Sequence, residues 1–222
     1  MEERKELLLI GHSFIRRLQQ FCFKPETFNL GLDPQKEVVN FFHTDRNNQL
    51  LATISLMNQE LQLCNYWQDI PEVVYIEMGS NDLFNNRFQG QASPTHLADQ
   101  LLEGVGFLKH EGVPSVIVGA AIPRTGDGRY GAASHIPPEE QNWKDLWDFE
   151  ESSVTDTQKF NDRLSSRIKT CYQGVYFEKK KGFTEGWPGK LGDGVHLKEG
   201  QPQQKYWSNM RSMAINHFDR LG

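Results

Sequence analysis

The segment LLLIGHSF, residues 7–14, sets the expectation for the fold. It opens with a run of aliphatic residues, which is typical of a central parallel strand because helices cover such a strand on both faces. The strand ends at Gly11, and apolar residues then recur at helical spacing from Phe14 to Phe21. We read this stretch as the first strand–helix unit of an α/β domain.

The alternation of strand and helix continues along the chain. Further strands are predicted at 37–42, 73–78, 115–122 and 174–177, and further helices at 50–63, 94–108, 155–170 and 199–219. Repeated units of this kind give parallel strands joined by right-handed crossovers. We therefore expect one domain over 1–222: a three-layer α/β/α sandwich with a five-stranded parallel sheet in the flavodoxin-like order 2-1-3-4-5.

One long stretch interrupts this alternation. Residues 123–152 are rich in Gly and Pro and contain Trp143 and Trp147. Loops of this length are uncommon in compact domains and are often functional, so we expect an irregular loop or lid here. The two Trp side chains would line a substrate pocket for an acyl or lipid group, or would simply anchor the loop on the core.

Composition excludes several classes of protein. The 222 residues hold 24 Lys and Arg against 29 Asp and Glu, and this net charge of −5 disfavours nucleic-acid binding by this domain alone. The 3 Cys show no CxxC spacing, which favours reduced thiols inside a cell. A charged amino terminus and the lack of an apolar run of about 20 residues predict neither signal peptide nor transmembrane anchor. We expect an intracellular, cytoplasmic protein of undetermined oligomeric state.

Polar residues gather where the predicted strands end. They form three short motifs, GHS at 11–13, GSND at 79–82 and DGVHL at 193–197. In an open parallel sheet, sites lie beyond the carboxyl ends of the strands, so the first two motifs should be neighbours and the third can fold over the same edge. The sequence thus predicts a site at this edge.

These motifs contain the groups needed for acyl transfer. Ser13 at a strand-to-helix turn has an accessible hydroxyl and a backbone N–H that faces an incoming oxyanion. Asn81 offers a side-chain amide to the same anion. Asp193 and His196 can place a carboxylate and an imidazole on one side of a turn, where the acid fixes the tautomer of the base.

With all three motifs in this order, the chain resembles the SGNH (GDSL-type) hydrolase family from Leu7 to Ile215. The resemblance implies ester hydrolysis through an acyl-serine, without a cofactor. It implies Ser13 as nucleophile, His196 as base and Asp193 as its orienting acid. Ser13 and Asn81 would form the oxyanion hole, and Gly79 and Asp82 would shape the substrate-binding surface.

A longer string, GHSFIRRL at 11–18, supports a finer resemblance. It is similar to esterase domains in the first open reading frame of LINE-type retrotransposons, and to the α-subunits of intracellular platelet-activating-factor acetylhydrolase. This resemblance implies a small acetyl-type ester as substrate, either a small molecule or lipid-borne, and a domain that serves a larger polyprotein.

The chain departs from the family pattern at two positions. His12 stands where the family often has Asp, which removes no catalytic group. After the second strand, HTDRNN at 43–48 lacks the Gly that completes the oxyanion hole. Loss of one such donor raises the activation barrier by about 2.7–4 kcal/mol and so slows turnover. This leaves open a catalytically decayed module that binds an acyl or glycan ligand, and a carbohydrate O-acetylesterase is a further alternative.

Structural interpretations remain for several of these residues. Ser13 could cap the following helix, and Asn81 and Asp82 could form a strand-end turn. The lysines at 179–181 are more often solvated than ligand-binding. No set of His, Cys, Asp and Glu has metal-ligand spacing, so we expect no metal.

Overall fold

The computed structural model describes residues 4–43, 53–63, 69–89, 92–123, 143–181, 183, 190–191 and 196–221, with backbone alone at 85–89 and 143–153. Its sheet consists of β1 (Lys5–Gly11), β2 (Glu37–Phe42), β3 (Val73–Glu77), β4 (Ser115–Gly119) and β5 (Val175–Glu178). All neighbouring strands are parallel, in the order β2-β1-β3-β4-β5. The predicted fold class and strand order are therefore confirmed.

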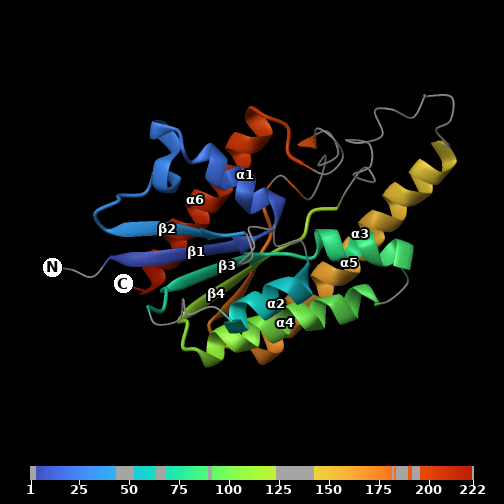
Figure 1. Cartoon of the computed structure of the whole chain (residues 1–222), viewed down its shortest axis with the longest axis horizontal. Helices are drawn as coiled ribbons and strands as arrows, with labels where there is room; N and C mark the ends of the chain where they lie inside the picture. Colours follow the sequence, from blue (N-terminus) through green and yellow to red (C-terminus); the bar gives the residue numbers. More distant parts are fainter. Residues whose placement is uncertain are drawn as a thin grey trace.

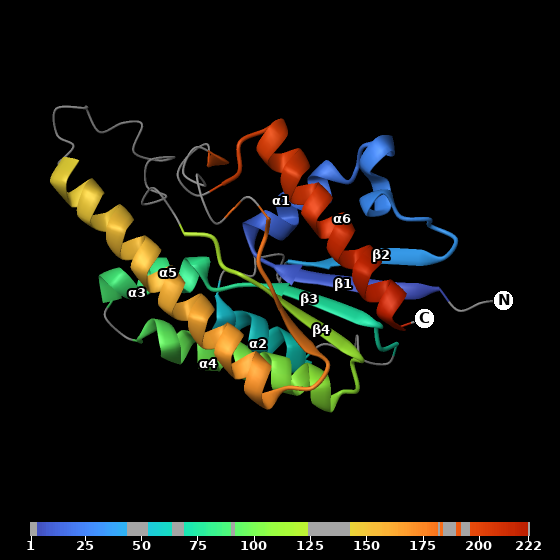
Figure 2. The ribbon, with the colours of Figure 1, turned by 180° about the vertical axis from the view of Figure 1, so that it is seen from behind.

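Helices form the two outer layers. They are α1 (Ser13–Phe21), α2 (Ile54–Leu63), α3 (Ser80–Gln89), α4 (Pro94–His110), α5 (Trp143–Cys171) and α6 (Gln201–Leu221), with a 3-10 segment η1 at Pro25–Gly31. Figure 1 and its reverse view, Figure 2, show α1 and α6 on one face of the sheet and α2, α4 and α5 on the other.

The side chains of β1 alternate between the two faces of the sheet, and both faces are buried. Leu8 and Ile10 of β1 belong to the hydrophobic cluster with α2, α4 and α5. Leu7 and Leu9 belong to the cluster with α1 and α6. Successive side chains of a strand point to opposite faces, so an uninterrupted aliphatic run serves both layers.

The main differences from the sequence prediction concern α5, α3 and β4. Helix α5 begins at Trp143, so the predicted loop at 123–152 is helical over its last part, and residues 124–142 lie outside the described residues. Helix α3 was not predicted. Its sequence is mostly polar, and Leu83 is the one buried apolar side chain that the structure describes in it. Strand β4 ends at Gly119. The side chain of Asn161 hydrogen-bonds to the backbone N–H and carbonyl of Ala121, at 2.9 and 3.0 Å, so these groups are not available to a neighbouring strand.

Within the described part of the chain, no helix combines the length and apolar character needed to cross a membrane.

Helix α6 carries a histidine that makes stability depend on pH. His217 is buried, with Nδ1 3.3 Å from the hydroxyl of Ser115 and its ring edge-on to Tyr176. Burial, with a smaller contribution from Arg220, lowers the pKa of His217 from 6.5 to about 4. Between these values the unfolded chain binds a proton that the folded chain does not.

We therefore predict that the free energy of unfolding falls as pH decreases from 6.5 to about 4, with up to about 3 kcal/mol due to His217. His217→Asn should flatten this slope in urea titrations at several pH values. His110→Asn, an exposed position at the end of α4, is the matched control and should keep the wild-type slope. Equal slopes for all three proteins would contradict the assignment.

Candidate active site

The pairing of β1 with β3 determines which residues meet at the carboxyl edge of the sheet. Gly11 lies beside Glu77 in the parallel register. Two residues further along each chain come Ser13 and Gly79, so the GHS and GSND motifs leave the sheet side by side. The predicted neighbourhood of these two motifs is therefore confirmed.

Ser13 is the first residue of α1. The cap position belongs to His12, whose side chain makes no capping hydrogen bond, so helix capping does not account for Ser13. The Ser13 hydroxyl is 3.4 Å from Nδ1 of the buried His12 ring, and Ser13 itself is 6% exposed. Amides in the first turn of a helix lack intrahelical acceptors and lie at the positive end of the helix dipole. This placement gives an anion at Ser13 a favourable field.

The GSND motif opens a second helix at the same edge. Asn81 lies in the first turn of α3, directly after the turn at Gly79. Ser80 donates a hydrogen bond to the carbonyl of Ile122 at 3.2 Å, which ties this turn to the segment after β4. Asp82 accepts a hydrogen bond from the backbone N–H of Ile54 at 3.0 Å and so caps α2. This gives Asp82 a structural role, and its contact with substrate stays a prediction.

Gly79 is required by the backbone. Its φ is +107°, which disfavours any side chain, and a Cβ here would lie 2.5 Å from the ring of Phe160 in α5. The close approach seats the amino end of α3 against α5. A direct substrate contact of Gly79 is likewise still a prediction.

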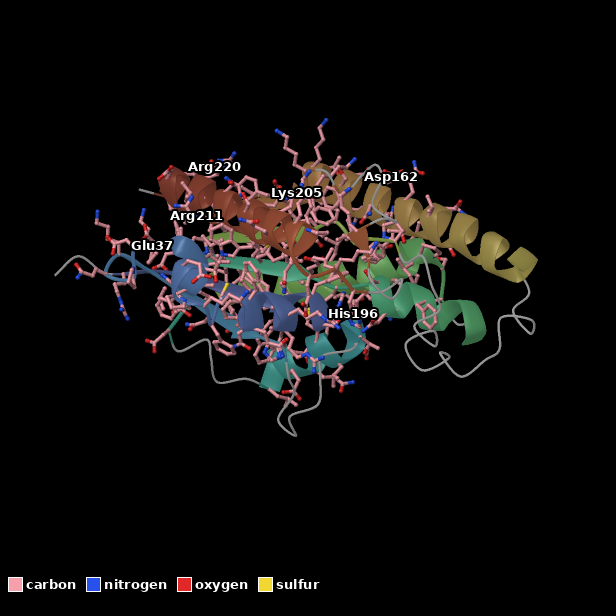
Figure 3. The ribbon with its side chains drawn as sticks, turned by 90° about the horizontal axis from the view of Figure 1, so that it is seen from above. Glu37, Asp162, His196, Lys205, Arg211 and Arg220 are labelled. Carbon is pink, nitrogen blue, oxygen red and sulfur yellow. The ribbon has the colours of Figure 1, made fainter. Side chains whose placement is uncertain are left out.

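His196 lies at the same end of the molecule. Figure 3 labels it close to α1, the helix that begins at Ser13. It precedes Leu197, which forms an antiparallel bridge with Leu191, and the N–H of Lys198 donates to the carbonyl of Lys190 at 2.8 Å. Leu191 and Leu197 are buried in the cluster that also contains Phe14, so the neighbours of His196 and of Ser13 share one core.

One predicted site residue, Asp193, lies outside the described residues, so its pairing with His196 stays a prediction. The structure places the backbones of Trp143 and Trp147 in α5 and does not describe their side chains.

The segment after β2, where the sequence lacks the family's oxyanion-hole Gly, lies outside the described residues at 44–52. His43, the last described residue there, has Nε2 2.6 Å from Oε1 of Gln19. Burial, followed by the charge of Arg16, lowers the pKa of His43, which favours the neutral ring.

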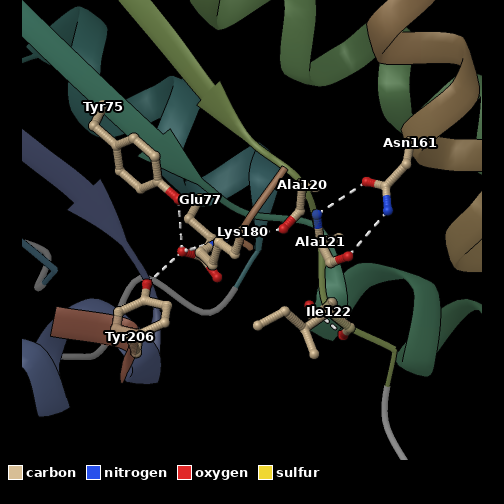
Figure 4. Close-up of polar contacts among 9 residues, drawn as sticks. Tyr75, Glu77, Ala120, Ala121, Ile122, Asn161, Lys180 and Tyr206 are labelled. Carbon is tan, nitrogen blue, oxygen red and sulfur yellow. Dashed lines mark hydrogen bonds and ion pairs between the residues drawn. The ribbon is translucent and has the colours of Figure 1, made fainter. Parts of the chain in front are cut away.

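A buried polar cluster that was not predicted from the sequence lies below this edge (Figure 4). Glu77 is 1% exposed and accepts hydrogen bonds from the hydroxyls of Tyr75 and Tyr206, and Lys180 Nζ lies 2.8 Å from the same carboxylate oxygen. Lys180 is 4% exposed, so it does not belong to a solvated lysine run. The one feature of the sequence that could have indicated this cluster is a carboxylate, Glu77, within the otherwise apolar strand β3.

Burial determines the protonation of the donors in this cluster. It raises the pKa of Tyr75 and of Tyr206, with the charge of Glu77 adding to the shift, so both phenols stay protonated and can donate. Burial lowers the pKa of Lys180, and the adjacent Glu77 carboxylate opposes this shift.

A cavity of about 320 Å³ lies beside the cluster, between α5 and the segment that follows β4. Ala121, Ile122 and Phe183 form apolar parts of its wall, and Thr157 and Lys180 add polar atoms. Among the described residues, no group of three or more His, Cys, Asp or Glu is placed to hold a metal ion.

Gly79→Ala should lower the free energy of unfolding by about 2 kcal/mol or more, because it adds both backbone strain and a clash with Phe160. Gly106→Ala is the matched control, since Gly106 is inside α4 with no atom within 4 Å of the added Cβ. That change should be neutral or stabilise by up to about 1 kcal/mol. Urea denaturation measures both, and a neutral Gly79→Ala would contradict the close packing.

Comparisons with known proteins agree with the architecture. No protein-family model and no curated protein sequence matches the chain. A Streptococcus pneumoniae protein named for platelet-activating factor aligns with a TM-score of 0.60 at 14% identity, covering 96% of this chain and 85% of that one. A Clostridium thermocellum family 3 carbohydrate esterase gives 0.56 at 15% identity, covering 99% of both chains.

A mutant acetyl esterase with a bound acetate ion aligns with a TM-score of 0.55 at 13% identity, covering 98% of this chain and 100% of that one. At such identities the similarity establishes the fold. The chain thus has the three-layer α/β fold of these three proteins.

Proposed function

We propose that this protein is a serine esterase that hydrolyses small, acetyl-type carboxylic esters through an acyl-serine intermediate. The observation that carries the proposal is the position of Ser13, which is the first residue of α1 at the carboxyl end of β1 without serving as its cap. The turn that carries Asn81 leaves the sheet beside it and opens α3. Two helix amino ends near one hydroxyl favour a developing negative charge there.

The reaction would proceed in two steps, acylation of Ser13 and hydrolysis of the acyl-serine. His196 accepts the proton of the Ser13 hydroxyl as Oγ attacks the ester carbonyl carbon, and the Ser13 N–H and the Asn81 amide hold the oxyanion. The tetrahedral intermediate collapses, the C–O bond to the alcohol breaks, and His196 returns the proton to the leaving alcohol. Water then attacks the acyl-serine by the same route and releases the acid. Asp193 would orient the imidazole throughout.

Substrate class is the finer part of the proposal. The fold neighbours include an acetyl esterase and a carbohydrate esterase, which supports a short acyl group. Trp143 and Trp147 would line the pocket for the rest of the ester. The GHSFIRRL string supports kinship with the retrotransposon esterase domains and with it a lipid-borne acetyl substrate. A carbohydrate O-acetylesterase is the second candidate, and acetylated xylo-oligosaccharide assayed beside acetyl-phospholipid separates the two.

Ser13→Ala should lower kcat for p-nitrophenyl acetate at pH 7.5 by about 10³-fold or more, because it removes the nucleophile. Ser115→Ala is the control, since Ser115 is another buried serine, at the amino end of β4 and hydrogen-bonded to His217. It should retain wild-type kcat. A folded Ser13→Ala protein with wild-type kcat would refute the nucleophile, and an inactive wild type would favour the decayed binding module.

A further inference from the structure

The carboxylate of Glu77 connects three separate parts of the fold. One of its oxygens, Oε2, receives the hydroxyl of Tyr75 from β3 itself at 2.9 Å, the hydroxyl of Tyr206 from α6, and Nζ of Lys180 from the segment after β5 at 2.8 Å. All four side chains are at most 4% exposed. Figure 4 shows the donors converging on this oxygen.

Stability alone is a weak explanation for such a group. The desolvation of a buried ion pair often cancels its attraction, and apolar replacements of similar volume are frequently as stable. The other oxygen of Glu77, Oε1, is buried and has no hydrogen-bond partner among the described residues. Buried charged groups in native proteins usually have all their hydrogen bonds, so the unpartnered oxygen of Glu77 suggests a role beyond stability.

The location of Glu77 indicates what that role is. Glu77 is in register with Gly11 and precedes Gly79 by two positions, so it lies directly below the turns that carry Ser13 and Asn81. Two of its partners, Lys180 and Tyr206, flank His196 in the sequence. The carboxylate therefore fastens both sides of the His196 segment to the strand that ends at the site.

Ring contacts extend this connection to the site itself. The ring of Tyr206 lies 6.1 Å from that of Phe14, the residue after Ser13, and 6.1 Å edge-on from that of Phe183. Nζ of Lys190 lies 5.6 Å from the Phe183 ring. The carbonyl of Lys190 accepts the Lys198 N–H, two residues from His196.

We propose that Glu77, Lys180 and Tyr206 form a positioning network that holds His196 in reach of Ser13. The network acts through the packing around the His196 segment and not on substrate, and its kinetic consequence rests on the proposed esterase function. Tyr75 donates to the same oxygen but belongs to the same strand as Glu77, so it contributes hydrogen bonding without joining elements.

This difference gives a matched pair of variants. Tyr206→Phe and Tyr75→Phe each remove one hydroxyl from the same carboxylate oxygen and keep the ring. Both should lower the thermal midpoint by a similar few degrees. Tyr206→Phe alone should lower kcat for p-nitrophenyl acetate by about tenfold with KM unchanged, because misplacement of the base slows the chemical step. It alone should accelerate hydrogen exchange of the Lys198 amide, measured by NMR.

The exchange readout separates this proposal from the esterase proposal. Faster Lys198 exchange in Tyr206→Phe alone, with an inactive wild type, would support the positioning network and refute the esterase function. Equal kcat and equal Lys198 exchange in the two variants would overturn the network, whatever the activity of the wild type.

Should Tyr206→Phe fail to fold, the double variant Glu77→Gln/Lys180→Met removes both charges without leaving one unpaired. Its Lys198 amide should also exchange faster than in the wild type. Wild-type exchange in the folded double variant would overturn the proposal.

Discussion

The parallel pairing of β1 with β3, with Gly11 beside Glu77, is the constraint on which the site depends. It makes two strands end at the same level, so that the chain leaves the sheet twice at one place, each time into a helix. Ser13 begins one of these helices and Asn81 lies in the first turn of the other. A slip of this pairing by one residue would move all side chains of one strand to the opposite face of the sheet.

Packing below the edge makes this arrangement rigid. Gly79 takes a backbone conformation that suits glycine and brings α3 against Phe160. Ser80 and Asn161 bind the chain that follows β4, and Asp82 binds the start of α2. In the proposed esterase, donors that are fixed before charge develops would stabilise the oxyanion, and these contacts fix the turn that carries Asn81.

The sequence predicted the sheet well because parallel strands buried on both faces have a simple signal. Uninterrupted aliphatic runs such as Leu7–Ile10 are typical of central strands in a covered sheet, and right-handed crossovers then limit the possible strand orders. The start of α5 was placed too late, and α3 was missed. The sequence of α3 is mostly polar, and the helix is held by contacts at its amino end that depend on the tertiary structure.

The candidate site was predictable to a different degree. Ser13 and Asn81 follow from the strand-end rule, which needs only the order of elements. Glu77 and Lys180 did not follow, since a carboxylate in a strand and a lysine in a basic run each have common exposed counterparts. Their pairing depends on β3 and the end of β5 meeting α6 in space, and neither periodicity nor spacing contains that information.

Covalent capture tests the central claim, an activated serine at the start of α1, most directly. The wild-type protein is treated with a fluorophosphonate, which requires an activated nucleophile, and the adduct is located by peptide mass spectrometry. The account predicts one adduct per chain, on Ser13. No adduct on a folded protein, or an adduct on another residue, would contradict it.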